Sequence, residues 1–142
     1  MRDDRFETLK RDFARGFPAF CGIQAMHAAH GVFETRLEVL PDHVQQDGFV
    51  HAGVMATMAD HTAGYAAFTT VLQSQRILTI EFKINFFKPA TGQQMSCRAR
   101  VINGGRRIIV SEADLFSIRD GDEKQVAKAI VTLMAVDAAS LD

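Results

Sequence analysis

The run His51–Leu72 (HAGVMATMADHTAGYAAFTTVL) constrains the fold more than any other stretch, because it is predominantly apolar and contains no Lys, Arg or Pro. A helix of this composition is typically buried on most of its circumference. At about 1.5 Å per residue it would extend roughly 30 Å, the width of a small domain. We therefore expect a central helix with a sheet wrapped around it.

One carboxylate, Asp60, lies inside this run between Ala59 and His61. Burying a carboxylate without a partner is costly, so Asp60 needs either a structural partner or a chemical role. The residues alone favour neither explanation. His51 and His61 do not have the spacing of a zinc-binding helix, so we expect no metal site.

Most of the remaining chain alternates apolar and polar residues over short stretches, a pattern that predicts half-buried β-strands. Two strands are expected before the helix, over Gly22–Ala28 and Gly31–Leu40. Four more are expected after it, as a meander with tight turns at 104–105 and 120–122: Arg76–Lys88, Gln94–Ile102, Arg106–Ile118 and Lys124–Val136.

The first strand after the helix has a bulky apolar face and a polar face. The apolar face is expected to cover the helix and comprises Leu78, Ile80, Phe82, Ile84 and Phe86. The polar face is expected to meet solvent, a partner subunit or a site, and comprises Thr79, Glu81, Lys83 and Asn85.

Apolar residues at spacings of three and four predict an amphipathic helix over residues 3–17, which Gly16 and Pro18 would end. The chain of 142 residues fits one domain, 1–142, with its core over 22–136. Strands gathered around one segregated helix indicate an α+β fold with an antiparallel sheet.

The composition argues against several classes of partner and compartment. A formal net charge of −1 argues against binding to nucleic acid or to an anionic membrane surface. Cys21 and Cys97 have no metal-binding spacing, which favours two free thiols over a disulfide. The N-terminal segment lacks the apolar region of a signal peptide, so we expect a cytoplasmic protein.

The start of the central helix has no Ser, Thr, Asp or Asn immediately before it, and the nearest candidate cap, Asp47, lies several residues back. The backbone N–H groups of Ala52 and Gly53 would then be free to bind an anion or a polarised carbonyl oxygen. Asp60 lies about 12 Å further along the helix axis, too far to share one carbonyl carbon with Ala52. The two can act together only across a two-fold dimer with antiparallel helices.

The chain contains an ordered series of short elements: Gln45, His51-Ala52-Gly53, Asp60, Thr79 and Lys88-Pro89-Ala90 with Gly92. Their order and spacing resemble the hotdog-fold acyl-CoA thioesterases, especially the phenylacetate-pathway and thioesterase-superfamily-member-2 group. The resemblance covers residues 22–136. It implies a curved antiparallel sheet around one long helix and active sites between the subunits of a homodimer. It further implies a dimer or a dimer of dimers that needs no cofactor, because CoA is part of the substrate.

The resemblance also implies roles for the matching residues. Asp60 would act as general base or nucleophile on the thioester, and the N–H of Ala52 would polarise the thioester carbonyl. Gln45 would lie near that carbonyl, His51 would orient the site, and Thr79 would help to hold the attacking water.

Two positions depart from the usual family pattern. The motif that ends at Gly53 reads His-Ala-Gly, where His-Gly-Gly is usual. The role expected of Ala52 uses only its backbone N–H, so alanine can fill it. Gln45 stands in place of Asn and reaches one methylene further.

Such an enzyme would hydrolyse an acyl-CoA to free acid and CoA. Lys88, Arg106 and Arg107 are candidates for the CoA phosphates, although solvated charge explains them equally well. A hotdog dehydratase or hydratase stays an alternative. That chemistry needs a His and an acidic residue placed to act on the acyl chain, and this helix offers only Asp60 followed by His61. A non-catalytic acyl-CoA binding module is the other alternative.

Overall fold

The computed structural model describes the backbone of residues 2–141 and the side chains of residues 4–141. Its helices are α1 (Arg2–Phe13), α2 (Gly16–Cys21), α3 (Ala52–Phe68) and the short 3₁₀ helices η1 (Pro41–His43) and η2 (Ala138–Leu141). Its strands are β1 (Ile23–Ala29), β2 (Val32–Glu38), β3 (Gln75–Phe86), β4 (Gln94–Gly104), β5 (Ile108–Arg119) and β6 (Asp122–Asp137).

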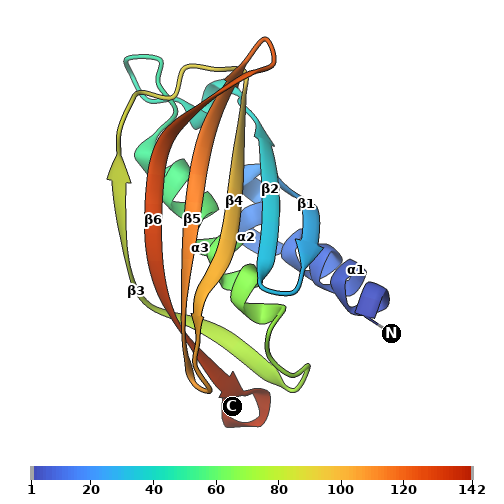
Figure 1. The fold of residues 1–142 in the computed structure, drawn as a ribbon. Coiled ribbons are helices and arrows are strands. Elements are labelled where there is room, and N and C mark those ends of the chain that lie inside the picture. Colours follow the sequence, from blue (N-terminus) through green and yellow to red (C-terminus); the bar gives the residue numbers. More distant parts are fainter. Residues whose placement is uncertain (1, 142) are drawn as a thin grey trace.

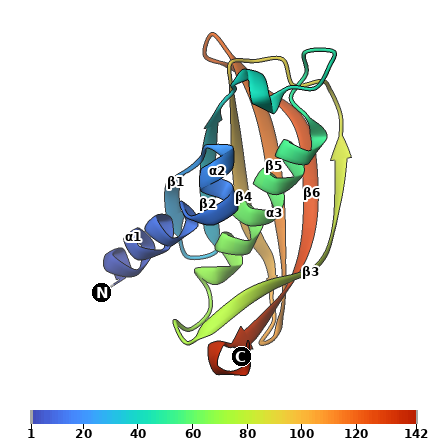
Figure 2. The same ribbon diagram turned by 180° about the vertical axis from the view of Figure 1, so that it is seen from behind.

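The strands form one curved antiparallel sheet that wraps around α3 (Figure 1). Seen from behind, α1 and α2 lie on the same side of the sheet as α3 (Figure 2). The buried side of α3 consists mainly of small residues and Met: Met55, Met58, Ala59, Thr62, Ala63, Ala66 and Ala67. These small side chains let the sheet approach the helix closely, and the predicted α+β fold with a buried central helix is confirmed.

The order of strands in the sheet is β1-β2-β4-β5-β6-β3, so the predicted meander of four strands is wrong in one respect. β3 pairs with β6, not with β4. The segment after β3 cannot form a tight hairpin, because Pro89 breaks it and its backbone is bonded elsewhere. Phe87 donates its N–H to the carbonyl of Val126 at 2.7 Å, and Ala90 accepts the N–H of Val50 at 3.0 Å. β4 therefore pairs with β2, and β3 becomes an edge strand.

The N-terminal segment forms two helices, so the prediction of one helix over 3–17 is wrong in extent. α1 ends at Phe13, and α2 begins at Gly16, which has a positive φ of 63°. Pro18 does not end a helix, because it lies in the first turn of α2, where a missing N–H costs nothing. Phe13 is fully buried and stacks on Phe33 at 5.3 Å between ring centroids, which fixes α1 to the core.

α3 ends at Phe68, four residues before the predicted end at Leu72. The hydroxyls of Thr69 and Thr70 donate to the carbonyls of Ala66 and Ala67, at 2.6 and 2.7 Å. The guanidinium of Arg5 donates to the carbonyls of Phe68 and Val71, at 2.8 and 2.5 Å. The bonds to Ala66, Ala67 and Phe68 satisfy carbonyl groups at the end of α3, and the bond to Val71 holds the segment that follows.

A β-bulge at Ile80 changes which side chains of β3 face the helix. Thr79 pairs with Leu133 of β6, but Glu81 pairs with Thr132. The register shift places Thr79 on the same face as Phe82, which pairs with buried Val131, whereas Leu78 points to the outer face. The predicted separation of Thr79 from the apolar face is therefore wrong, because a bulge reverses the alternation of side chains.

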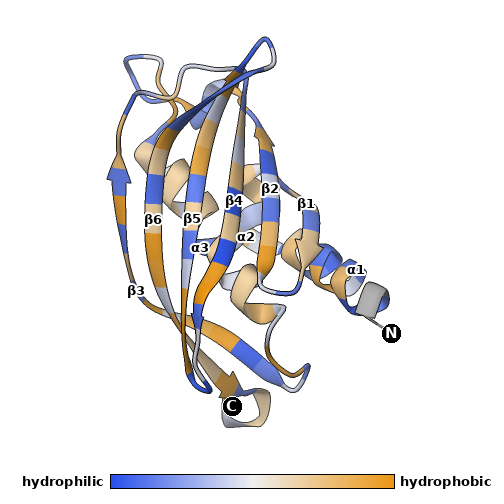
Figure 3. Ribbon diagram, viewed as in Figure 1, coloured by the Kyte–Doolittle hydropathy of each residue, from blue (hydrophilic) through white to orange (hydrophobic). Residues whose placement is uncertain are grey.

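Much of β3 is uncovered in the single chain. Ile80, Phe82 and Phe86 are 52%, 38% and 44% exposed, and Phe87, which follows β3, is 54% exposed. In Figure 3, β3 carries apolar residues along an open edge of the sheet. An exposed apolar edge strand is a template for pairing with another chain.

The cysteines agree with the expectation from the sequence, and the helices allow one further observation. Cys21 and Cys97 are both free thiols, as predicted. None of the helices within residues 2–141 has the length and apolar character needed to cross a bilayer.

Candidate active site

The first turn of α3 is capped by the histidine that precedes it. The Nδ1 atom of His51 accepts the backbone N–H of Gly53 at 2.8 Å, and the N–H of His51 itself donates to the carbonyl of His43 at 2.8 Å. The expectation of two free N–H groups is therefore wrong for Gly53. The N–H of Ala52 has no hydrogen-bond partner within the described residues, so one donor remains at the positive end of the helix dipole.

The presence of glycine at the end of the His-Ala-Gly motif can be explained sterically. A Cβ atom added to Gly53 would lie 3.0 Å from Nδ1 of His51 and 3.3 Å from its Cε1. A side chain at this position would press on the ring that caps the helix. Gly53 thus allows His51 to approach the backbone closely.

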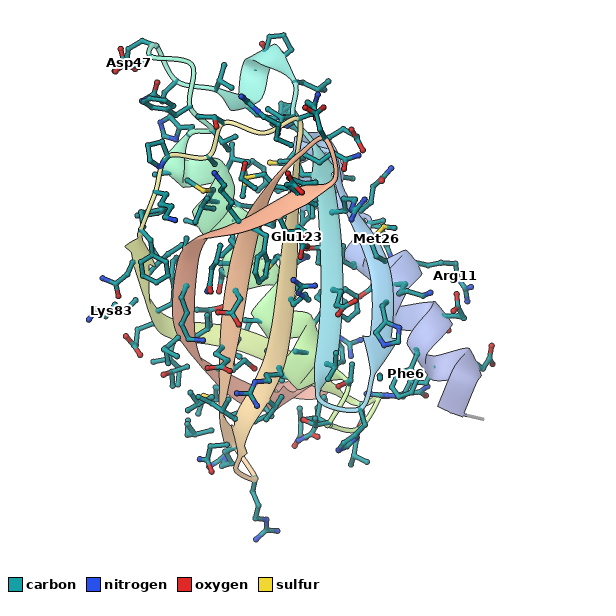
Figure 4. All side chains as sticks on the ribbon, turned by 45° about the horizontal axis from the view of Figure 1, so that its top comes forward. Phe6, Arg11, Met26, Asp47, Lys83 and Glu123 are labelled. Carbon is teal, nitrogen blue, oxygen red and sulfur yellow. The ribbon has the colours of Figure 1, made fainter. Side chains whose placement is uncertain are left out.

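Ala52 lines a hollow of about 510 Å³ at the start of α3. Gln45 and His51 line it on the polar side, and Met55, Phe86 and Phe87 supply apolar walls. Gln45 is held in the preceding loop, because its Oε1 accepts the N–H of Asp47 and its own N–H donates to Phe49 at 2.8 Å. Asp47 lies on that loop (Figure 4), and the cap of α3 is His51, not Asp47.

Asp60 lies half-buried in the middle of α3, beside β3. The hydroxyl of Thr79 donates to its Oδ1 at 2.7 Å. The bulge at Ile80 makes this bond possible, because it turns Thr79 toward the helix. A charge-assisted bond of this kind fixes the carboxylate in one orientation.

Within one chain, the two halves of the candidate site do not meet. Asp60 and Thr79 line a separate hollow of about 240 Å³, which contains neither Ala52 nor Gln45. The separation agrees with the distance of about 12 Å along the helix. One acyl carbonyl cannot contact Asp60 and Ala52 of the same chain.

His61, which follows Asp60 in α3, packs against aromatic side chains. The ring of His61 packs on Phe13 of α1 at 4.6 Å and on Tyr65 at 5.0 Å between centroids. Burial lowers the pKa of His61 below its usual value, against the opposing effects of Asp60 and Asp12. The imidazole is therefore held in its neutral form near neutral pH.

The described residues contain no group of three or more His, Cys, Asp or Glu side chains that could hold a metal ion. The site is instead built from a carboxylate, a hydroxyl and a backbone donor. Carboxylates and backbone donors of this kind are the groups that acyl-transfer chemistry uses for activation of water and stabilisation of an oxyanion.

Comparison with known proteins decides the family. The family model described as thioesterase superfamily matches residues 47–124, more than half of the chain. The chain belongs to the thioesterase superfamily. Its sequence resemblance to hotdog thioesterases is thereby confirmed, and membership supports the hydrolysis of thioester or ester bonds in general.

One solved structure agrees with this assignment, and others share the fold. A thioesterase family protein from Silicibacter pomeroyi is 35% identical, with 93% of this chain and 98% of that chain covered and a TM-score of 0.89. Two further structures show the same fold. Zebrafish thioesterase superfamily member 2 is 22% identical, with 91% and 96% covered and a TM-score of 0.79. A mutant of the phenylacetic acid degradation protein PaaI from Thermus thermophilus is 24% identical, with 83% and 96% covered and a TM-score of 0.72.

The cations that the sequence suggested for CoA lie apart in this thioesterase-superfamily chain. Lys88 lines the hollow at Ala52, whereas Arg106 lines a hollow of about 620 Å³ that contains Gln75, at the other end of β3. Arg107 lines neither, and its carbonyl accepts the N–H of Ala135 at 2.7 Å. Sequence reasoning missed Asp12 and Tyr65, whose side chains reach the hollow at Asp60 from α1 and α3.

Proposed function

We propose that the protein hydrolyses acyl-CoA thioesters at sites formed between two copies of the chain, with Asp60 from one copy and the start of α3 from the other. The observation that carries this proposal is the Thr79–Asp60 hydrogen bond of 2.7 Å beside an uncovered edge strand. A carboxylate that is oriented, half-buried and next to open apolar surface is suited to a reaction at an interface.

Two-fold pairing of β3 with β3 of the partner would cover its exposed apolar residues. Thr79 lies level with Asp60, and Phe86 lines the hollow at Ala52. If two β3 strands pair antiparallel with the two-fold axis midway between these residues, at Phe82–Lys83, Thr79 of one copy lies opposite Phe86 of the other. Asp60 of one copy is then brought next to the hollow at Ala52 of the other. Each dimer would then contain two equivalent sites, and pairs of dimers could assemble further.

The reaction follows from these groups. Asp60 removes a proton from a water molecule that attacks the thioester carbonyl, or it attacks the carbonyl itself to give an acyl-enzyme anhydride that water hydrolyses. The N–H of Ala52 of the partner subunit binds the oxygen as it becomes negative. The tetrahedral intermediate expels CoA as its thiolate, which takes up a proton, and the free acid leaves. Thr79 keeps the carboxylate aimed at the reacting carbon, while His51 and Gln45 shape the carbonyl end of the site.

The same pairing suggests how CoA is held. Antiparallel β3 strands bring the Lys88 end of one copy next to the Gln75 and Arg106 end of the other. Lys88 together with Arg106 and Arg107 of the partner subunit would offer cations from both chains to the CoA phosphates.

The position of His61 supports hydrolysis over dehydration or hydration. A dehydratase would need an imidazole and an acid that act together on the acyl chain, but the ring of His61 is packed on Phe13 at 4.6 Å. A non-catalytic acyl-CoA binding module would use the same hollows without turnover.

The test is to incubate the protein with a panel of acyl-CoAs and to titrate the released thiol. We expect release by the wild type, loss of release by Asp60→Asn with the oligomer intact, and retained release by Asp42→Asn, which changes an exposed carboxylate in η1. Tight CoA binding without release by the wild type would favour the binding module. Full activity of Asp60→Asn would refute the proposed role of Asp60.

A further inference from the structure

The hollow at Asp60 is small and has a polar end. It measures about 240 Å³ and is lined by Asp60 and Thr79, by Tyr65 about 7.5 Å further along α3, and by Asp12 and Arg76. For comparison, an engineered apolar cavity of about 150 Å³ binds one benzene molecule. A group about the size of a single ring, or a short chain of similar bulk, therefore fits this hollow, whereas a long fatty chain does not.

The end wall of the hollow is held in place by α1. The hydroxyl of Tyr65 donates to Oδ2 of Asp12 at 2.6 Å, and its ring contacts Phe13 and Phe68 at 5.2 and 5.6 Å between centroids. Burial and the Asp12 carboxylate raise the pKa of Tyr65 well above its usual value, so the phenol stays protonated and keeps donating. An apolar chain pushed further would also have to desolvate the Asp12 carboxylate, which is costly.

A second hollow lies beyond this wall. It measures about 300 Å³, is lined by Arg5, Thr8 and Leu9 of α1, and shares Asp12, Phe68 and Arg76 with the first. The shared residues therefore separate two adjoining spaces. Arg5 stabilises the arrangement, because its guanidinium donates to the carbonyl of Phe68 at the end of α3 and to that of Val71 just beyond it.

We propose that Tyr65, held by Asp12, ends the acyl subsite and restricts the enzyme to short acyl groups. The inference rests on the proposed function, since it places the thioester carbonyl at Asp60 and lets the acyl group run along α3 toward Tyr65. Gly64 lies one turn beyond Asp60 and lines the same hollow, which leaves space for the acyl group. The helix α1 thus sets substrate length through Asp12, although it carries no reacting group.

Two variants change the hollow in opposite directions. Tyr65→Ala removes the ring that lines the first hollow and the hydroxyl that holds Asp12, a residue shared with the second hollow, and so enlarges the space open to the acyl group. Gly64→Ala adds a methyl group on the hollow side, where its Cβ would meet Leu133 at 3.7 Å, an ordinary contact. Because alanine favours a helix over glycine, Gly64→Ala keeps the fold and remains informative even if Tyr65→Ala does not fold. The control is Arg11→Ala, which changes a side chain that projects from α1 into solvent (Figure 4).

The assay measures kcat/KM for straight-chain acyl-CoAs from two to twelve carbons, together with Kd for the matching S-alkyl-CoA thioethers, which cannot be hydrolysed. We expect wild-type kcat/KM to fall beyond about six carbons, the size of the group that the hollow admits. Tyr65→Ala should raise the ratio of decanoyl-CoA to butanoyl-CoA kcat/KM by about tenfold or more. Gly64→Ala should lower the ratio of hexanoyl-CoA to acetyl-CoA by about tenfold, and Arg11→Ala should change neither ratio.

A wild type that prefers long chains, or a Gly64→Ala profile equal to wild type, would overturn the inference while leaving the thioesterase proposal intact. If no acyl-CoA is hydrolysed but the thioethers bind with the expected length limit, the proposed function fails and the subsite stands. If neither turnover nor a length limit is found, both fail.

Discussion

Replacing Ala52 with proline would remove the proposed oxyanion donor and almost nothing else. Ala52 is the first residue of α3 and is exposed. Proline is well tolerated at the first helical position, where the N–H makes no helical bond. The preceding residue, His51, has φ −63° and ψ 137°, an extended conformation that a following proline accepts. The bond from Gly53 to Nδ1 of His51 is unaffected by the loss of the N–H at Ala52.

The expected effect on catalysis is large, whereas the effect on stability is small. Removal of one oxyanion-hole donor typically lowers kcat by about 100- to 1,000-fold, equivalent to ~2.7–4 kcal/mol of transition-state stabilisation. Proline at a compatible position leaves the free energy of unfolding unchanged or raises it by up to about 1 kcal/mol, because the unfolded chain loses conformational freedom. Ala52→Pro should therefore be a folded protein with a normal or raised Tm and a collapsed kcat.

Thiol release with a good acyl-CoA substrate measures kcat, and thermal denaturation measures Tm. The matched control is Ala52→Ser, which keeps the backbone N–H and should retain activity close to wild type. Wild-type kcat in a folded Ala52→Pro protein would refute the assignment of this N–H as the oxyanion donor.

Three further outcomes are expected. Thr79→Val should lower kcat by about tenfold or more through loss of its charge-assisted bond to Asp60, whereas Thr79→Ser should retain most activity; equal kcat values for the two variants would contradict this. Gly53→Ala should lower Tm by several degrees, because its Cβ would lie 3.0 Å from Nδ1 of His51 and disturb a helix cap that contributes about 1 kcal/mol to stability. An unchanged Tm would show that the His51 ring can move away. Burial lowers the pKa of His61, so as the pH drops below the unfolded-state His pKa of 6.5 the unfolded state takes up a proton there and the free energy of unfolding should fall. In denaturant titrations at pH 5 and pH 7.5, His61→Gln should reduce the difference between the two unfolding free energies, and a difference equal to that of the wild type would exclude His61 as its source.

The helix and the strands could be predicted because their signals are local. The small apolar residues of α3 and the alternation in the other segments depend on which face is buried, and burial is what the sequence encodes most directly. The helix end was predicted too late, because the hydroxyls and the Arg5 guanidinium that stop it at Phe68 depend on tertiary contacts as well as on composition.

The strand order and the bulge at Ile80 could not be predicted. The alternation through β3 is regular in the sequence, and the register shift appears only where the strand pairs with β6 around the curved sheet. That shift decides where Thr79 points, so the sequence pattern assigned it to the wrong face even though resemblance named it as a site residue. The wall formed by Asp12 and Tyr65 was missed for a similar reason, because it joins residues far apart in the chain.

The most direct measurement mixes two inactive variants, Asp60→Asn and Ala52→Pro, carrying different affinity tags. In a mixed dimer, one site would combine the intact Asp60 of one chain with the intact Ala52 of the other, while the second site would lack both groups. Random pairing makes about half of the dimers mixed, each with one working site of two, so thiol release should recover to about a quarter of the wild-type rate per chain. Purified mixed dimers without activity, from variants that are each folded and dimeric, would contradict a site shared between subunits.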